Sequence, residues 1–225
     1  MGKKISALKS APACLIIFAK EPELGRVKTR LGTLLSAQDC LGLYKAFLKD
    51  TSALVGRVDC PLKILAYDVW QKQPRYLKKI FPQCIFYRQK GKNLGERMHQ
   101  AFQYAQKFGA RGTVIIGSDA PTLPAEYIKQ AFKRLSKKDV VLGPSYDGGY
   151  YLIGVNAPCQ NLFKDVAWSC DQVLKTTLQN AESLGKRVCL LKKWWDIDDA
   201  EGLKSLHKKF QYADGQGFWT KRFLG

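Results

Sequence analysis

Residues 14–31 read CLIIFAKEPELGRVKTRL, an apolar run followed by a basic loop. The run at 14–19 is typical of a strand that is buried in a parallel sheet. The loop turns at Gly25 and carries four cations, Lys20, Arg26, Lys28 and Arg30. Backbone amides and cationic side chains of such a loop can surround a diphosphate and neutralise its charge. The loop matches neither the Walker A nor the GxGxxG pattern, so these motifs give it no support. We interpret it as a phosphate-binding loop, and the alternative is an exposed basic turn.

Strand-like and helix-like segments alternate along the rest of the chain, which is the pattern of βαβ units on a mostly parallel sheet. Short runs of Ile, Val, Leu and aromatic residues predict further strands at 63–67, 84–87, 113–117, 140–143, 150–155 and 187–191. Apolar residues at three- and four-residue steps predict helices at 36–55, 73–80, 94–108, 124–136, 170–184 and 200–210.

Local signals mark the ends of several predicted helices. Ser36 is placed to cap the N-terminus of the first helix. Gly109 and Gly185 each follow the C-terminus of a predicted helix, a position that favours a left-handed backbone conformation. Within residues 94–108 one buried face is predicted, formed by Leu94, Met98, Ala101, Phe102 and Ala105.

Length and composition limit the class of protein. A chain of 225 residues suits one α/β domain, so we expect a single domain over residues 1–225. The 37 Lys and Arg residues against 19 Asp and Glu give a net charge of +18, which attracts phosphates, nucleic acid or anionic membranes. These cations are spread along the chain without a nucleic-acid-binding signature, so nucleic acid is not an expected partner.

The cysteines and the apolar runs indicate a compartment. Seven cysteines without a CxxC pair are typical of thiols in a reducing environment, and their spacing with two histidines fits no structural zinc site. The longest clean apolar run, 14–19, is too short to span a bilayer. We therefore expect a cytoplasmic protein without a membrane span.

A carboxylate follows the predicted strand at 113–117, in Gly117-Ser118-Asp119-Ala120-Pro121. In an open parallel sheet the ligand crevice lies beyond the carboxyl ends of the strands. Magnesium prefers one or two carboxylates plus substrate phosphates, so Asp119 is our first candidate metal ligand. The alternative is an Asp that only accepts hydrogen bonds from the backbone of a turn.

A second candidate is Asp147, in Asp147-Gly148-Gly149 between the two strands predicted at 140–143 and 150–155. Asp-Gly between apolar runs is a strong hairpin signal, which alone explains both glycines. If this turn faces the crevice, Asp147 can orient an acceptor hydroxyl or support the metal.

A third group of carboxylates follows the last predicted strand, in Asp196-Ile197-Asp198-Asp199. Asp198 or Asp199 can cap the next helix. Alternatively, Asp198 or Asp196 reaches the cation that Asp119 holds.

Taken in order, these segments resemble the nucleotide-diphospho-sugar transferase (GT-A-type) superfamily, and within it a small bacterial glycosyltransferase family associated with arsenosugar biosynthesis. The resemblance covers nearly the whole chain. Its matching segments are Ala19-Lys20-Glu21-Pro22 with 25–31, Asn93-Leu94-Gly95-Glu96-Arg97-Met98, 117–121, 143–154, Trp168-Ser169 and 196–198. It implies a single three-layer α/β/α domain with a mostly parallel, Rossmann-like sheet.

The resemblance also implies roles for particular residues. Gly25, Lys28 and Arg30 are expected to touch the nucleotide phosphates, Gly95 and Arg97 to lie near the nucleoside, and Asp119 and Asp198 to coordinate Mg²⁺ or Mn²⁺. We accordingly predict Asp119, Asp147 and Lys28 as catalytic residues, with Lys20 and Arg26 as further phosphate contacts. Two departures from the family pattern are a single aspartate in Gly117-Ser118-Asp119 in place of Asp-x-Asp, and Cys170 where Thr is usual.

Three functions remain open from the sequence. The preferred one is a metal-dependent glycosyltransferase that moves a sugar from a nucleotide sugar to a small-molecule acceptor. The second is a nucleotidyltransferase, similar to guanylyltransferases, that uses a nucleoside triphosphate and releases pyrophosphate. The third is a non-catalytic nucleotide- or RNA-binding module, which only the basic charge suggests.

Overall fold

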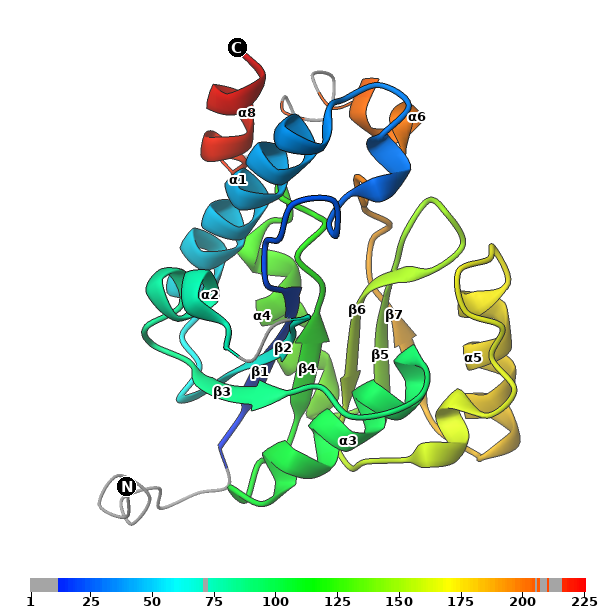
Figure 1. Cartoon of the computed structure of the whole chain (residues 1–225). Helices are drawn as coiled ribbons and strands as arrows, with labels where there is room; N and C mark the ends of the chain where they lie inside the picture. The colour runs from blue at the N-terminus through cyan, green and yellow to red at the C-terminus, as the bar shows by residue number, and fades with distance from the viewer. Residues whose placement is uncertain (1–11, 71–72, 205, 207–209, 211–215) are drawn as a thin grey trace.

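A seven-stranded sheet lies between two layers of helices (Figure 1). The computed structural model describes residues 12–70, 73–204, 206, 210 and 216–225. The strands are β1 (Cys14–Lys20), β2 (Leu62–Asp68), β3 (Ile85–Arg88), β4 (Thr113–Ile116), β5 (Val140–Pro144), β6 (Tyr150–Val155) and β7 (Val188–Leu190). All seven predicted strands are confirmed, with small differences at their ends.

The sheet has the order β3-β2-β1-β4-β6-β5-β7 and is mostly parallel. Only β6 runs antiparallel to its two neighbours, β4 and β5, while the other pairs of adjacent strands are parallel. Because of this reversal, β6 begins at the edge of the sheet where the parallel strands end. The first residues of β6 therefore lie beside the ends of β4 and β5.

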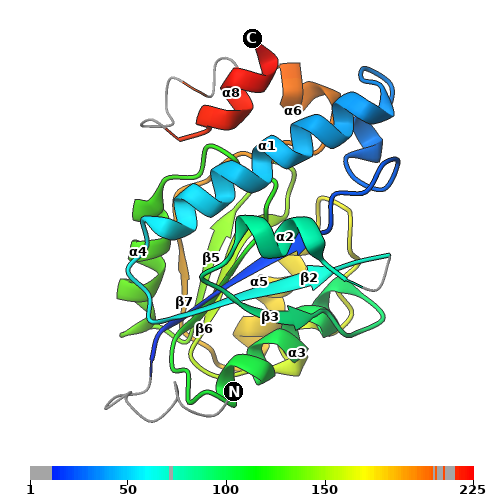
Figure 2. The same ribbon diagram turned by 60° about the vertical axis from the view of Figure 1, so that its left-hand side comes forward.

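Helices cover both faces of the sheet, which confirms the predicted three-layer α/β/α fold (Figure 2). One face packs against α1 (Ala37–Gly56), α2 (Arg75–Ile80) and α4 (Ala125–Leu135). The other face packs against α3 (Leu94–Gln106), α5 (Val173–Ser183) and the short 3-10 helix η2 (Gln160–Phe163). The side chains of β1 alternate between the two cores, because successive residues of a strand point to opposite faces. Leu15 and Ile17 belong to the core on the α1 side, and Cys14 and Ile16 belong to the core on the α3 side.

The predicted capping residues are confirmed, although α3 (Leu94–Gln106) and α5 (Val173–Ser183) are shorter than the predicted helices. The Ser36 hydroxyl accepts a hydrogen bond from the Asp39 amide at 3.1 Å and caps α1. Gly109 and Gly185 follow α3 and α5 with φ of 75° and 63°. On α3 the predicted apolar face is buried except at Leu94, which is 44% exposed and lines a cavity. Leu94 was therefore wrongly predicted as a core residue, because the first turn of α3 extends beyond the sheet.

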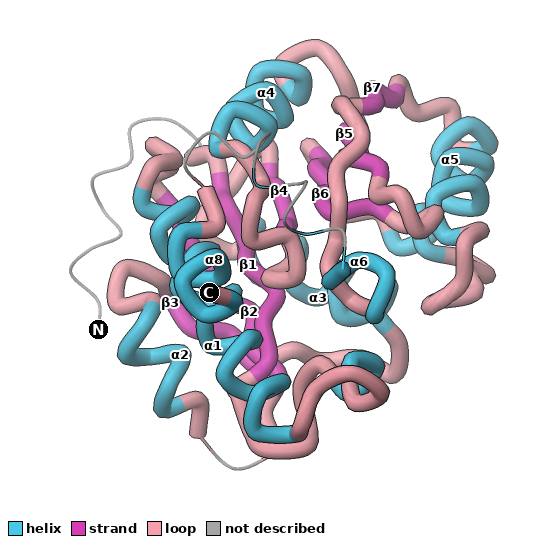
Figure 3. Tube along the Cα trace, turned by 90° about the horizontal axis from the view of Figure 1, so that it is seen from above, coloured by secondary structure: helices cyan, strands magenta, loops and turns pink. Residues whose placement is uncertain are grey.

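The C-terminal part of the chain differs from the prediction. Of the helix predicted at 200–210, the structure describes α6 (Ala200–Lys204), and 205 and 207–209 lie outside the described residues. A helix that we did not predict, α8 (Phe218–Leu224), packs on α1, and Figure 3 shows the two side by side. The buried Asp50 carboxylate of α1 accepts hydrogen bonds from the amides of Trp219 and Thr220, at 2.9 and 2.8 Å.

We expect Asp50→Ala to lower the free energy of unfolding by about 2 kcal/mol, because buried N–H groups lose a charged acceptor. Urea denaturation measures the change, and the exposed Asp59→Ala serves as the control, with an expected change within about 0.5 kcal/mol. Equal stability of the two variants would show that Asp50 does not fasten α8.

Candidate active site

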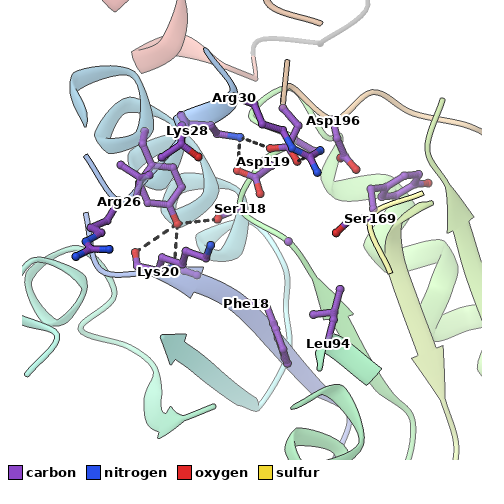
Figure 4. A pocket seen from close by; sticks show the side chains of 18 of the residues that line it. Phe18, Lys20, Arg26, Lys28, Arg30, Leu94, Ser118, Asp119, Ser169 and Asp196 are labelled. Carbon is purple, nitrogen blue, oxygen red and sulfur yellow. Dashed lines mark hydrogen bonds and ion pairs between the residues drawn. The ribbon is translucent and has the colours of Figure 1, made fainter. Parts of the chain in front are cut away.

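A cavity of about 510 Å³ opens at the carboxyl ends of β1 and β4 (Figure 4). Ala19 and Lys20 come from the end of β1, Ser118 and Asp119 follow β4, and Tyr150 begins β6. The basic loop 26–30 and the segment after β7 complete the walls. Lys28, Asp119 and Asp198, which come from three distant segments, thus meet beyond the strand ends as expected.

Lys28 occupies the centre of this site. Its ammonium lies 2.5 Å from Asp119 Oδ1 and 2.9 Å from Asp198 Oδ1, and it donates a hydrogen bond to the Ile197 carbonyl at 2.7 Å. The side chain is only 3% exposed. Burial disfavours the charged ammonium, but the two carboxylates outweigh it and raise the pKa of Lys28. Three segments that are remote in the sequence therefore meet at one buried cation.

The backbone of Lys28 is left-handed, with φ of 51° and ψ of 35°. This conformation is unfavourable for a residue with a Cβ and persists only where the surroundings impose it. Here it directs the side chain from the basic loop toward the carboxylates, above the ring of Phe47 at 5.0 Å. Lys28 was predicted to touch phosphate, and in this structure its ammonium is turned to Asp119 and Asp198.

The segment after β7 is fixed to the end of β4, because the Ile197 amide donates to the Asp119 carbonyl at 2.9 Å. This contact brings Asp196 and Asp198 to the cavity. Burial and the neighbouring charges of Asp119, Asp147 and Asp198 raise the pKa of Asp196 well above its ordinary value. For Asp198, burial acts in the same direction, but Lys28 outweighs it and lowers the pKa.

The chemistry of this donor set fits a hard divalent cation. Asp119 and Asp198 offer two carboxylates that approach one point, and Mg²⁺ often uses one or two carboxylates plus phosphate oxygens. Among the described residues, no three His, Cys, Asp or Glu side chains are grouped to hold a metal. The remaining ligands would therefore have to come from substrate and solvent, and the cation would replace the Lys28 ammonium.

The predicted phosphate-binding cations line one side of the cavity: Lys20, Arg26, Lys28 and Arg30. Arg30 is 61% exposed and lies 4.0 Å from Asp198, and the Arg26 guanidinium lies over the Trp70 ring at 4.1 Å. Gly25 is not part of the lining, and its φ of 70° allows the loop to turn before Arg26.

Of the two predicted nucleoside contacts, Arg97 lines the cavity and Gly95 does not. Arg97 lines the cavity with Gln89 and Leu94, and its guanidinium bonds to the Asp68 carboxylate at 3.1 Å. Gly95 is buried and lies outside the lining. A Cβ at Gly95 would come within 2.7 Å of Phe163 and of Trp168, so this glycine permits close packing of α3.

Asp147 lies outside the cavity lining. The hairpin interpretation is confirmed, because β5 and β6 pair antiparallel on either side of this turn. The Asp147 carboxylate accepts hydrogen bonds from the Ser145 hydroxyl and from the Gly149 amide, the latter at 3.0 Å. The structure thus gives it a role within the turn, and its predicted contact with an acceptor stays a prediction.

Sequence reasoning missed several cavity residues. The Tyr44 hydroxyl accepts from the Lys20 amide at 2.9 Å and bonds to the Ser118 hydroxyl at 3.1 Å, joining the ends of β1 and β4. Ser118 had a signal, since it precedes Asp119. Tyr44 had none, because a tyrosine in the middle of an apolar helix face reads as core. Ser169 lines the opposite wall.

The fold and the cavity at the strand ends define a nucleotide-diphospho-sugar transferase fold. The chain is similar to the crystal structure of a "putative nucleotide-diphospho-sugar transferase" from Desulfovibrio desulfuricans G20, with a TM-score of 0.87, 31% identity, and coverage of 94% of this chain and 93% of that one. Residues 48–170 match the family described as "Uncharacterized protein conserved in bacteria (DUF2064)". The chain belongs to this family.

More distant structures share the fold alone. The inositol-1-phosphate CTP transferase from T. maritima has a TM-score of 0.58 and 14% identity, over 92% of this chain and 98% of that one. A 4-diphosphocytidyl-2C-methyl-D-erythritol synthase from Anaerococcus prevotii has a TM-score of 0.55 and 11% identity, over 89% and 99%. A comparison with curated proteins finds no match. None of the helices among the described residues is long and apolar enough to cross a bilayer.

Proposed function

We propose that this protein is a metal-dependent glycosyltransferase that moves a sugar from a nucleotide sugar to a small hydroxyl-bearing acceptor. One observation carries the proposal: the basic loop, Asp119 and Asp198 meet at a single cavity, joined by the Lys28 ammonium. Phosphate-binding cations and metal-binding carboxylates are the two requirements for activating a sugar diphosphate. The 31% identical Desulfovibrio structure, described as a nucleotide-diphospho-sugar transferase, supports the same class of donor.

The walls of the cavity suggest how the donor lies. Gln89 and Arg97, which bond to the Ala66 carbonyl and the Asp68 carboxylate of β2, stand on the side of β2 and β3 and would take the nucleoside. Arg26, Lys28 and Arg30 would contact the diphosphate, and the β6 side remains for the sugar. Cations around the diphosphate stabilise the charge that develops as it leaves.

Asp119 and Asp198 are the residues that would hold Mg²⁺ or Mn²⁺, which supplies further charge stabilisation at the diphosphate when bound. In the reaction the acceptor oxygen forms a bond to the anomeric carbon of the sugar. The bond from that carbon to the diphosphate oxygen breaks and its electron pair leaves with the nucleoside diphosphate, while the proton of the acceptor hydroxyl passes to solvent. The protein chiefly positions the two reactants against each other.

Nucleotidyl transfer is the second candidate. A specific observation favours it: one aspartate, Asp119, follows β4, whereas glycosyltransferases of this fold usually carry Asp-x-Asp. In that reaction the acceptor attacks the α-phosphorus of a nucleoside triphosphate and pyrophosphate leaves. The same loop and carboxylates would serve, so the geometry of the cavity is compatible with both.

A product assay separates these candidates. The protein is incubated with Mn²⁺ and a panel of nucleotide sugars and nucleoside triphosphates, with and without simple sugars and polyols as acceptors, and heat-shift measurements record binding. Release of nucleoside diphosphate from a nucleotide sugar is the expected result. Pyrophosphate release supports the second candidate, and binding without turnover indicates a non-catalytic nucleotide-binding protein.

A further inference from the structure

Ser169 combines an unfavourable backbone with a place on the cavity wall. Its φ is 67°, which makes it one of three described non-glycine residues with a left-handed backbone, together with Lys28 and Asp165. A serine has no special tolerance for this region, so the surrounding structure must impose it. Two of the three, Lys28 and Ser169, line the same cavity from different walls.

The loop that carries Ser169 is fixed at both ends. On one side Trp168 packs against Phe163, with ring centroids 6.3 Å apart, and against Gly95 at the start of α3. On the other side the Leu174 amide donates to the Gly148 carbonyl at 2.9 Å. Gly148 itself approaches the loop so closely that a Cβ there would collide with the Asp171 backbone.

These contacts hold the loop between α3 and the turn that joins β5 to β6. None of these contacts requires a hydroxyl at position 169. The sequence motif Trp168-Ser169 is therefore only half explained by packing: Trp168 anchors the loop, whereas Ser169 is exposed to the cavity. Unfavourable backbone conformations cluster at binding and active sites, so a residue in one beside a cavity is a candidate for a functional contact.

The position of Ser169 selects the part of the ligand that it can reach. The sheet order places β2 and β3 on one side of β1, and β4 and β6 on the other. Figure 4 shows the Ser169 hydroxyl facing the cavity from the β6 side, across from Lys20 and Arg26. A donor with its nucleoside at Arg97 and its diphosphate at the basic loop would therefore present its remaining portion to Ser169.

We propose that the Ser169 hydroxyl forms a hydrogen bond with a hydroxyl of the sugar carried by the nucleotide donor. Ser169 is thus a specificity-determining residue that acts on the sugar and not on the nucleotide. This inference rests on the proposed function, because it requires a nucleotide sugar in the cavity.

Calorimetry with matched ligands tests the inference. UDP and UDP-glucose, and GDP and GDP-mannose, are titrated in Mn²⁺ into wild type, Ser169→Ala and Ser169→Gly. For the pair that wild type binds, Ser169→Ala is expected to lower the affinity for the nucleotide sugar about tenfold, which corresponds to the loss of one neutral hydrogen bond. The affinity for the nucleoside diphosphate should stay within about twofold of the wild-type value. Cys170→Ala is the control, because Cys170 is the exposed neighbour and lies outside the lining.

Ser169→Gly separates the hydroxyl from the backbone. Glycine adopts a left-handed conformation without penalty, so this variant should melt about 3 °C higher than Ser169→Ala yet show the same loss of nucleotide-sugar affinity. Unchanged affinity in both variants, or equal losses of affinity for the nucleotide sugar and its nucleoside diphosphate, would overturn the inference about Ser169. The proposed function would still stand. If wild type binds none of the four ligands and the wider panel shows only triphosphate binding or none, the proposed function fails and this inference falls with it.

Discussion

Lys28→Met should bind Mn²⁺ about tenfold more tightly than wild type when no nucleotide is present, and it should bind nucleoside diphosphates more weakly. The first effect follows from the ammonium that lies 2.5 Å from Asp119 and 2.9 Å from Asp198. A metal ion must displace this ammonium, and hydrogen bonds between charged groups contribute about 1.5–3 kcal/mol, which converts to about tenfold or more. Methionine removes the competing charge and keeps most of the side-chain volume.

The second effect follows from the place of Lys28 in the basic loop. Once a metal ion has taken the carboxylates, the released ammonium can turn to the diphosphate, and the variant lacks that contact. Titration of free Mn²⁺ by electron paramagnetic resonance measures the metal, and calorimetry measures the nucleotide. Lys20→Met is the matched control, because Lys20 lines the same cavity and acts on Asp198 by its charge, yet among the described residues it forms no ion pair with Asp119 or Asp198. Unchanged or weaker Mn²⁺ binding in Lys28→Met would show that the ammonium and the metal do not share a site.

Asp119→Asn should reduce metal-dependent nucleotide binding on the order of 100-fold, since it removes one of the two carboxylates that would hold the cation under the proposed function. The fold should remain intact, because the Asp119 side chain is 39% exposed and the Asp119 contact that fixes the segment after β7 uses its backbone carbonyl. Nucleotide affinity with and without Mn²⁺ gives the effect, and circular dichroism checks the fold.

Asp147→Asn is the matched control for this change. It makes the same chemical substitution at a carboxylate that lies in the β5–β6 turn, outside the cavity lining. Its nucleotide affinity should stay within about twofold of wild type. If Asp119→Asn retains full affinity in the presence of metal, Asp119 is not a metal ligand. A large loss in Asp147→Asn would instead support the role for Asp147 that the sequence suggested.

Most of the fold could be predicted because it follows from local rules. Buried parallel strands produce short apolar runs, and the seven runs in this chain correspond to the seven strands. Parallel strands end at a common edge, and this rule predicts the meeting of Lys28, Asp119 and Asp198 that the structure has. The sequence did not reveal that β6 is reversed within the sheet, although the Asp147-Gly148 hairpin signal pointed to it.

The errors have physical causes that the sequence does not carry. The orientation of Lys28 depends on its left-handed backbone conformation. The local sequence Val-Lys-Thr does not predict this conformation. Leu94 has the spacing of a core residue, but α3 begins beyond the sheet, so its first turn meets the cavity. The helix α8 was missed because seven residues are too few for a clear period, and its fastening to Asp50 is a tertiary contact.

The sheet order has a consequence for synthesis of the protein. Strands β1 to β4 come from residues 14–116 and occupy adjacent places in the order β3-β2-β1-β4. As the chain leaves the ribosome, this half can assemble before the rest exists, since domains generally fold from the N-terminus onward. Until β6 arrives, β4 would present an unpaired edge that invites association with other chains. Lys28 and Asp119 would meet early, whereas Asp198 would join them among the last parts of the molecule to be made.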